Sequence, residues 1–279
     1  LRCLVGSEMC IRDRVTTRNE RTLVINPLKW ENGMYRMDLD AFREQIKGCK
    51  LFILCNPHNP GGVVWTEAEL RAIADICYDE KVLVFSDEIH ADLTLPPHTH
   101  RPFATVSEKA RMNSVTFMSP SKAFNMPGLS ASHALIFNED LRKRFRIYMD
   151  AGELDMGHVF AFLSVEAAYS HGTEWLDQCL AYIQGNIDFV DEFLKKHAPK
   201  IKAIRPEASY LVWLDCRELE LSQKDLNEFF VDKAHLALND GEMFGKEGIG
   251  FMRLNVASPR CIIEKAMKQL ADAYQLYIK

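Results

Sequence analysis

Lys122 is the residue whose surroundings point most directly to chemistry. Between Met112 and Asn138 it is the only Asp, Glu, Lys or Arg, and the apolar segments on either side are typical of buried strands. Burying an ammonium group without a partner is costly, so a lysine in such a segment needs a purpose. Desolvation favours the neutral amine, which is the form that makes a Schiff base with a carbonyl group. The competing interpretation is a solvated lysine, which is the usual state of this residue type.

Two hydroxyl side chains flank this lysine. Ser119 and Ser121 fall where a predicted strand passes into a loop. Hydroxyls and backbone N–H groups at such a junction suit a phosphate group. Turn formation would explain both serines equally well without the lysine.

Three further polar positions are expected near the same edge of a sheet. Asp87 ends a predicted buried strand. A carboxylate there can pair with a pyridinium nitrogen and keep a cofactor electron-withdrawing. The alternative is that Asp87 caps a helix or is a surface acid. Asn59 lies in a loop of prolines and glycines that follows another buried strand, although this loop could be just a turn. Arg253 interrupts an apolar strand, where it could grip a carboxylate in a bidentate manner or form a buried structural ion pair.

A metal site is not expected. His90, Asp92, His98 and His100 are potential ligands, but their spacing matches no standard metal-binding pattern and Pro96-Pro97 lies among them.

The elements that position these residues alternate between strand and helix. Thr66 and Glu69 form a predicted capping box ahead of a helix. Expected strands are 51–56, 82–86, 114–118, 134–137, 201–204, 210–215 and 251–256, and expected helices are 67–77, 141–148, 159–170, 174–197, one after Ser222 and one from Pro259. The pattern predicts an α/β fold, in which a mostly parallel sheet carries helices on both faces and a smaller C-terminal α+β domain follows. We expect a large cofactor-binding domain over residues 15–197, incomplete at its N-terminus, and a small domain over 198–279.

The first fourteen residues are treated separately. Leu1–Arg14 has no signal-peptide layout, and it fits neither helix nor strand periodicity. It resembles a translated sequencing-adaptor read-through, so we expect it to be a non-family tail outside the fold.

Composition narrows the classes of partner. The formal net charge of −5 argues against nucleic acid or an anionic membrane as a partner. No apolar run approaches the roughly 20 residues that span a bilayer. Eight scattered cysteines without a CxxC pair indicate a reducing, cytoplasmic compartment.

In order and spacing, these motifs resemble fold-type I enzymes that use pyridoxal 5′-phosphate (PLP), the aspartate aminotransferase superfamily, from about Leu23 to the C-terminus. The resemblance implies that Lys122 carries the cofactor and acts as the catalytic base. It further implies that the 3′-oxygen of the pyridine ring binds Asn59, the ring nitrogen binds Asp87, the phosphate binds Ser119 and Ser121, and the substrate α-carboxylate binds Arg253.

Within that superfamily, residues 27–38, 86–92 and 250–260 resemble the MalY/PatB group of cystathionine β-lyases, or C–S lyases. His90 stands where typical aminotransferases have a cofactor-contacting Tyr, and Ser130 stands where many have a phosphate-binding Arg. The resemblance implies a cytoplasmic enzyme that cleaves cystathionine or related cysteine thioethers to a thiol, pyruvate and ammonia. A class I/II aminotransferase and an inactive fragment that keeps the fold are the alternatives.

Members of this group carry a further N-terminal stretch with a phosphate loop, a ring-stacking aromatic residue and part of the small domain. Nothing upstream of Val15 matches that stretch, so we expect an incomplete active site here and a homodimer when the protein is full length.

Overall fold

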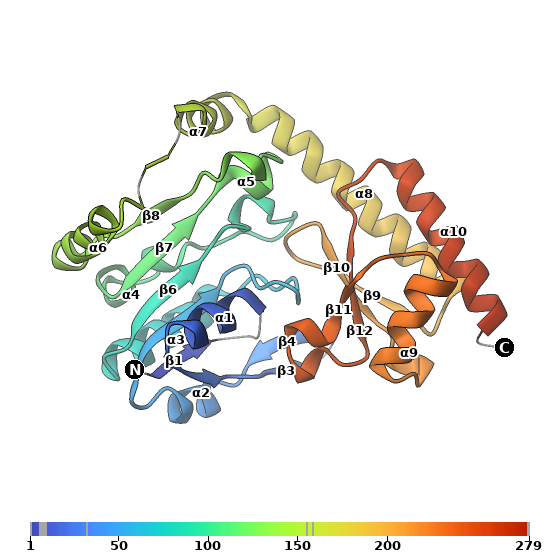
Figure 1. The fold of residues 1–279 in the computed structure, drawn as a ribbon, viewed down its shortest axis with the longest axis horizontal. Helices are drawn as coiled ribbons and strands as arrows, with labels where there is room; N and C mark the ends of the chain where they lie inside the picture. The colour runs from blue at the N-terminus through green and yellow to red at the C-terminus, as the bar shows by residue number, and fades with distance from the viewer. Residues whose placement is uncertain (1, 6–9, 32, 155, 158, 278–279) are drawn as a thin grey trace.

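A six-stranded sheet forms the centre of the larger part of the molecule. The computed structural model describes residues 2–5, 10–31, 33–154, 156–157 and 159–277. The strands lie in the order β2-β1-β5-β6-β7-β8 and all neighbours are parallel except β7 and β8, which confirms the predicted mostly parallel sheet. The strands are β1 (Arg2–Val5), β2 (Thr22–Ile25), β5 (Cys49–Cys55), β6 (Leu83–Asp87), β7 (Ser114–Met118) and β8 (His133–Leu135). Figure 1 shows this sheet at one end of the molecule.

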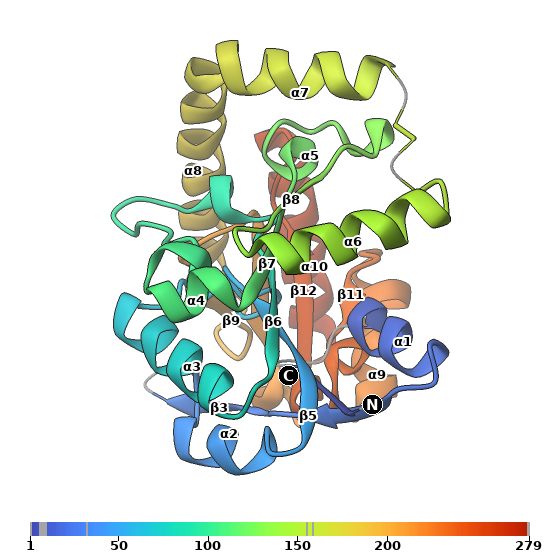
Figure 2. The ribbon, with the colours of Figure 1, turned by 90° about the vertical axis from the view of Figure 1, so that its left-hand side faces the viewer.

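Helices cover both faces of this sheet. In Figure 2 the helices α3 and α4 lie on one side of it and α1 lies on the other. These helices are α1 (Cys10–Arg18), α2 (Leu39–Gln45), α3 (Glu67–Asp79) and α4 (Glu108–Met112). The predicted capping box is present, because Thr66 accepts a hydrogen bond from Glu69 N and the Glu69 carboxylate accepts one from Thr66 N. Leu70, Ile73 and Cys77 then recur on the face of α3 that packs into the core, as their helical spacing predicts.

The expectation that residues 1–14 fit neither helix nor strand is wrong for the described part of this segment. Strand β1 lies between β2 and β5, and α1 begins at Cys10. A strand of four residues is too short for a periodic signal, and its place depends on hydrogen bonds to strands that come later in the chain. That these residues form a non-family tail stays a prediction.

Three long helices follow the sheet. They are α6 (Glu139–Ala151), α7 (Val159–His171) and α8 (Thr173–His197). Helix α8 runs from the top of the larger part of the molecule down to the smaller part (Figure 1). No helix in the described ranges is long and apolar enough to cross a membrane.

The smaller part of the molecule is built on a four-stranded antiparallel sheet. Its strands lie in the order β11-β12-β10-β9, and two helices complete it. The elements are β9 (Lys202–Ile204), β10 (Leu211–Asp215), α9 (Gln223–Glu228), β11 (Asn239–Asp240), β12 (Phe251–Asn255) and α10 (Arg260–Tyr277). The C-terminal half of α8 belongs to the same hydrophobic core, so this helix connects the two parts by packing as well as by the chain.

An aromatic seam joins the small sheet to a hairpin that the sequence did not predict. The hairpin consists of β3 (Leu28–Glu31) and β4 (Met34–Met37). Trp213 of β10 stacks on Phe251 of β12 at 5.3 Å between ring centroids, and its Nε1 donates to the Tyr35 hydroxyl at 3.2 Å. Because these rings belong to the same hydrophobic core as residues of the six-stranded sheet, the two sheets are held in one orientation.

A second contact between the two parts depends on Gly62. Its φ of +68° is a conformation that glycine adopts at low cost. A Cβ atom placed on Gly62 would lie 2.6 Å from Cβ of Pro206. The Gly62 carbonyl also accepts a hydrogen bond from Glu207 N at 2.8 Å, so this close approach fixes the loop that carries Asn59.

We expect Gly62→Ala to lower the free energy of unfolding by about 2 kcal/mol, since it adds backbone strain and a steric overlap. Chemical denaturation monitored by tryptophan fluorescence measures the change. Gly128→Ala is the matched control, because no atom lies within 4 Å of its added Cβ. Equal stability of the two variants would contradict the assigned role of Gly62.

Candidate active site

The sequence-predicted residues meet at a cavity of about 360 Å³ between the two sheets. Its volume is in the range of small-molecule and cofactor sites. The described residues that line it are Arg12, Asn59, Asp87, Ile89, His90, Lys122, Tyr210, Leu211, Asn239, Arg253 and Asn255. Five residues expected from the sequence are therefore brought together, namely Asn59, Asp87, His90, Lys122 and Arg253.

Lys122 lies just beyond the carboxyl end of β7. It belongs to one short helical turn, α5 (Pro120–Ala123), rather than to the open loop that we predicted. The residue is half-buried, and its amine forms no hydrogen bond or ion pair with any described residue. The amine is therefore available to a ligand in the cavity.

Asp87 ends β6 and is aligned with Cys55 at the end of β5. Ile89, two residues further along, lines the same cavity, because alternate residues of a strand face the same side. Ser86 and Glu88 face the opposite side and are buried. Asp87 Oδ1 accepts no hydrogen bond from the described residues. Its Oδ2 accepts two, from Nε of Arg12 at 3.2 Å and from an Nη atom of Arg12 at 2.7 Å.

Arg12 is a residue that the sequence analysis missed. It is only 8% exposed, and its guanidinium also donates to Cys55 Sγ at 2.8 Å. Burial raises the pKa of the Cys55 thiol, so at neutral pH this sulfur accepts the bond as a thiol. No local pattern marks Arg12, because its partners lie far away in the sequence.

His90 lies against the same cavity and is 5% exposed. Burial lowers the pKa of His90 to about 4, so the imidazole is neutral at neutral pH. Its Nδ1 is buried without a hydrogen-bond partner among the described residues. An unpartnered polar atom at the wall of a cavity suits a ligand that supplies the missing hydrogen bond.

Arg253 reaches the cavity from β12 of the small sheet. It donates to Asn59 Oδ1 at 3.1 Å and to Asn239 Oδ1 at 2.8 Å, while its Nε is buried without a partner. No carboxylate among the described residues lies within 4.0 Å of the Arg253 guanidinium. Arg253 therefore does not form a structural ion pair with them, which was the alternative to binding a ligand carboxylate. Burial lowers the pKa of Arg253 from its ordinary value, which is the expected effect of a desolvated cation without a counter-ion.

Other residues of this wall could have been found from strand geometry. Asn255 is two positions after Arg253 on the same face of β12, and Asn239 is paired with Arg253 across β11 and β12. Tyr210 immediately precedes β10, and it lines the cavity beside Lys122.

The two serines do not line this cavity. Ser119 Oγ donates to the Ala131 carbonyl at 2.6 Å, and Ser121 Oγ donates to the same oxygen at 3.2 Å. Ser119 also caps α5, as turn formation would require. Ser130 is exposed, with a φ of 50° at the end of a 3-10 turn. Phosphate binding by Ser119 and Ser121 therefore stays a prediction.

No group of His, Cys, Asp and Glu in the described part of the chain could hold a metal ion. The four potential ligands have separate partners or positions. His100 contacts Glu88, His98 lies 3.8 Å from Glu207, Asp92 accepts from the Tyr169 hydroxyl and His90 lines the cavity.

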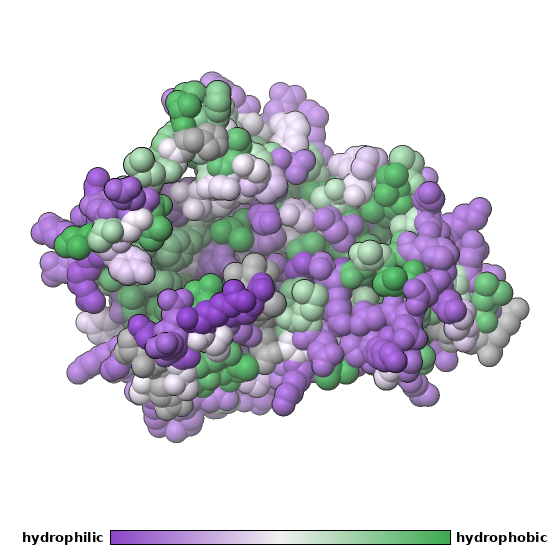
Figure 3. Space-filling model, in the orientation of Figure 1, coloured by the Kyte–Doolittle hydropathy of each residue, from purple (hydrophilic) through white to green (hydrophobic). Residues whose placement is uncertain are grey.

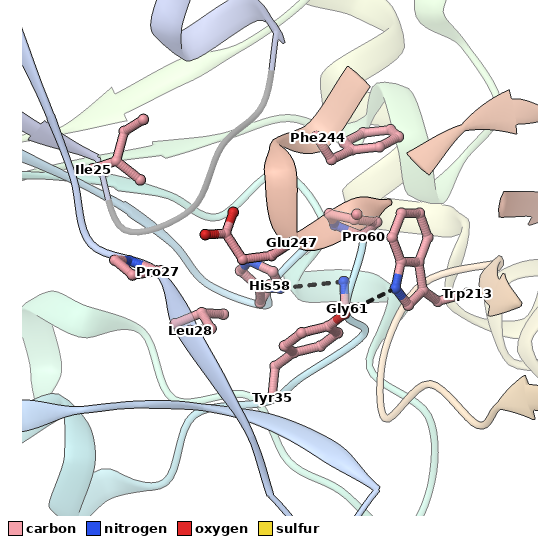
Figure 4. Close-up of a pocket in the computed structure, with 11 residues that line it drawn as sticks. Ile25, Pro27, Leu28, Tyr35, His58, Pro60, Gly61, Trp213, Phe244 and Glu247 are labelled. Carbon is pink, nitrogen blue, oxygen red and sulfur yellow. Dashed lines mark hydrogen bonds between the residues drawn. The ribbon is translucent and has the colours of Figure 1, made fainter. Parts of the chain in front are cut away.

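A smaller pocket is lined in part by His58, Pro60 and Gly61 of the loop that carries Asn59 (Figure 4). Its volume is about 40 Å³, which is too small for a cofactor. His58 Nδ1 accepts a hydrogen bond from Gly61 N at 3.2 Å, and burial lowers the pKa of His58 to about 3. The neutral His58 ring, which lies between Pro57 and Pro60 in the sequence, therefore holds this loop closed.

The cavity fits a PLP group in volume and in chemistry. It offers a half-buried amine at Lys122, a carboxylate oxygen at Asp87, the amide of Asn59 and the unpartnered Nδ1 of His90. Among the described residues, the Arg12 guanidinium on Asp87 Oδ2 is a contact that competes with the cofactor. The fold and the site thus define a PLP-dependent enzyme of fold type I.

The chain belongs to the aminotransferase class I and II family, whose family model matches residues 13–270. It is 37% identical over 258 residues to cystathionine β-lyase PatB of Bacillus subtilis, covering 92% of this chain and 67% of the relative. It is 34% identical to protein MalY of Escherichia coli, with 91% of this chain and 65% of the relative covered. The chain therefore spans about two thirds of the length of these curated relatives.

A solved structure agrees in fold and in cofactor. The solved structure of cystalysin of Treponema denticola contains PLP, and this chain is 32% identical to it in sequence. The two structures superpose with a TM-score of 0.96, over 100% of this chain and 71% of the cystalysin chain. PLP is accordingly the cofactor of this protein, as the sequence predicted.

We expect Arg12→Ala to tighten PLP binding by about tenfold, because it frees a carboxylate oxygen from a charge-assisted hydrogen bond. Titration of the protein with PLP, followed by visible absorbance, measures the affinity. Arg18→Ala, on the exposed end of the same helix, is the control. Weaker binding by Arg12→Ala would mean that Arg12 helps to hold the cofactor instead.

Proposed function

We propose that the protein is a PLP-dependent C–S β-lyase that cleaves cystathionine or a related cysteine thioether to a thiol, pyruvate and ammonia. One observation carries this proposal: a single cavity holds a lysine amine, a carboxylate and a guanidinium, and no described residue pairs with the amine or supplies a carboxylate to the guanidinium. An amino-acid substrate matches this set, since its α-carboxylate suits Arg253. The similarity to PatB favours a thioether over other amino acids.

Each polar residue of the cavity has a separate proposed role. Bound PLP withdraws electrons from the carbon that bears the amino group. Lys122 would hold the cofactor and then remove the Cα proton as a general base. Asp87 would hold the ring nitrogen in its protonated form, while Asn59 and the neutral His90 would bind the polar edge of the ring. Arg253 would fix the α-carboxylate, so that the Cα–H bond points toward the lysine amine.

Two outcomes share the step in which Cα loses its proton. In a lyase, a thiolate leaves Cβ, and the remaining fragment hydrolyses to pyruvate and ammonia. An aminotransferase would instead need a keto acid to accept the amino group. The two reactions share the same lysine, aspartate and arginine, so product analysis separates them.

We expect the intact protein, supplied with PLP and L-cystathionine, to release pyruvate and a thiol without an added keto acid. Lys122→Ala should lose this activity by at least about a thousandfold, because it lacks both the attachment point and the base. Coupled pyruvate and thiol assays measure both products. Amino transfer that depends on a keto acid and releases no thiol would establish an aminotransferase.

We further propose that the protein is a cytoplasmic homodimer. Among the described residues, Cys55, Cys77, Cys179, Cys216 and Cys261 form no disulfide, which suits a reducing compartment. Helix α7 buries only Ala161, while Phe162 and Leu163 are 63% and 54% exposed. Figure 3 shows apolar surface over this helix at the upper edge of the molecule. A surface of this kind normally contacts another chain.

We expect Phe162→Glu combined with Leu163→Glu to convert a dimer into a monomer, because the charges would be buried at the interface. Sedimentation velocity at micromolar concentration measures the change. Glu192→Ala, at an exposed position near the far end of α8, should leave the dimer intact. A wild-type protein that sediments as a monomer would refute the interface.

A further inference from the structure

A second cavity adjoins the cofactor cavity, and the roles assigned so far do not use it. Its volume is about 310 Å³. Lys122, Tyr210 and Asn255 line both cavities. The two cavities therefore meet at Lys122, the residue that would remove the Cα proton of a bound amino acid.

One wall of this second cavity is a face of helix α8. The wall residues are Trp175, Cys179, Tyr182 and Ile183, whose spacing places them on the same side of the helix. Ile183 is buried, whereas the two aromatic side chains are each 48% exposed. The aromatic rings thus offer apolar area that a ligand in the cavity could cover.

Both aromatic side chains are held in place by residues that do not line the cavity. Trp175 stacks on Phe124 at 6.1 Å between ring centroids and an angle of 26° between the ring planes. The Tyr182 hydroxyl accepts a hydrogen bond from Arg260 N at 2.6 Å. A side chain that is already fixed loses little conformational entropy when a ligand packs on it. This wall is therefore prepared for a ligand.

The second cavity carries little charge. Among the described residues that line it, Lys122 is the only one with a charged side chain. Burial raises the pKa of the Cys179 thiol, so this side chain is neutral at neutral pH. The amino and carboxylate groups at the far end of cystathionine would lose water here without gaining ionic partners for both. An uncharged substituent avoids this cost.

The size of the second cavity suits an aromatic ring. An apolar cavity of about 150 Å³ is large enough to bind benzene. The second cavity has about twice that volume, so it has room for an aromatic ring and the thioether sulfur that carries it.

We propose that the second cavity binds the sulfur substituent of the substrate and selects cysteine thioethers with an uncharged aromatic substituent over cystathionine. With the α-carboxylate on Arg253 and Cα beside Lys122, the sulfur would lie where the two cavities meet. This inference rests on the proposed lyase function, and it narrows the class of thioether on which the enzyme acts.

The test measures binding of amino acids that cannot release a thiol, so it does not depend on cleavage. L-homophenylalanine has a methylene group where S-phenyl-L-cysteine has sulfur, and L,L-2,7-diaminooctanedioate is the corresponding analogue of cystathionine. In isothermal titration calorimetry with the intact, PLP-loaded protein, we expect L-homophenylalanine to bind at least about tenfold more tightly. Equal affinities, or tighter binding of the charged analogue, would overturn the proposal.

Cys179→Phe should fill the second cavity. We expect this variant to bind L-homophenylalanine at least about tenfold more weakly, because its added ring occupies the space of the ligand. Affinity for L-alanine, whose side chain ends at Cβ, should stay within about twofold of the wild-type value. Asp177→Phe, at an exposed position on another face of α8, is the matched control and should change neither affinity. An equal loss for both amino acids in Cys179→Phe would contradict a site for the substituent.

Trp175→Ala tests the same wall without adding volume. Because Trp175 is half exposed, this variant should fold even if Cys179→Phe does not. Binding of L-homophenylalanine should weaken on the order of tenfold while binding of L-alanine is retained. Unchanged affinity for L-homophenylalanine in this variant would overturn the proposal.

S-phenyl-L-cysteine separates this inference from the proposed function. The lyase should release thiophenol and pyruvate from it more efficiently than it cleaves cystathionine. If the analogues bind with the expected preference but S-phenyl-L-cysteine yields no thiol, the lyase function fails while the selectivity of the second cavity is supported.

Discussion

The parallel register of β5, β6 and β7 is the constraint on which the rest of this molecule depends. Cys55 is aligned with Asp87, and Asp87 is aligned with Phe117. The three strands therefore end at one level, and the loops that leave them converge at one edge of the sheet. A slip of one residue in β6 would turn Asp87 into the core and Glu88 into the cavity. The buried hydrogen bonds that Glu88 accepts from Ser86 Oγ and Phe103 N oppose that slip, so the same interactions fix the register and the site.

The other half of the site comes from a separate sheet, so its geometry depends on how the two sheets meet. The Trp213 and Tyr35 contact and the close approach at Gly62 hold the small sheet against the large one. Arg253 then bonds directly to Asn59, which joins a small-sheet strand to a large-sheet loop inside the cavity. The site is thus complete only when both hydrophobic cores are formed.

Features set by local sequence were predicted well. The capping box at Thr66 marked the start of α3, β7 has the predicted bounds of Ser114–Met118, and Lys122, the isolated charge, lines the cavity. Chemistry at the ends of strands could be predicted because parallel strands place these ends together. The resemblance to a known family supplied the individual roles, which the residue types alone left open.

Features set by contacts distant in sequence were missed. The contact of Arg12 with Asp87, the place of β1 between two later strands and the pairing of Glu88 with His100 leave no periodic trace in the chain. The serines beside Lys122 both donate to the Ala131 carbonyl, a contact that the sequence did not predict. Residue type indicated what these side chains can do, and only tertiary packing decided what they contact.

The guanidinium of Arg253 has a practical consequence for anyone who handles this protein. A half-buried cation whose partners are neutral amides attracts any small carboxylic acid that can enter the cavity. Acetate, formate or citrate in a buffer would compete there with an amino acid, and so would the organic acids of a living cell. With Arg253 in its proposed role, apparent affinities for substrate would depend on the anion composition of the medium, separately from general ionic screening.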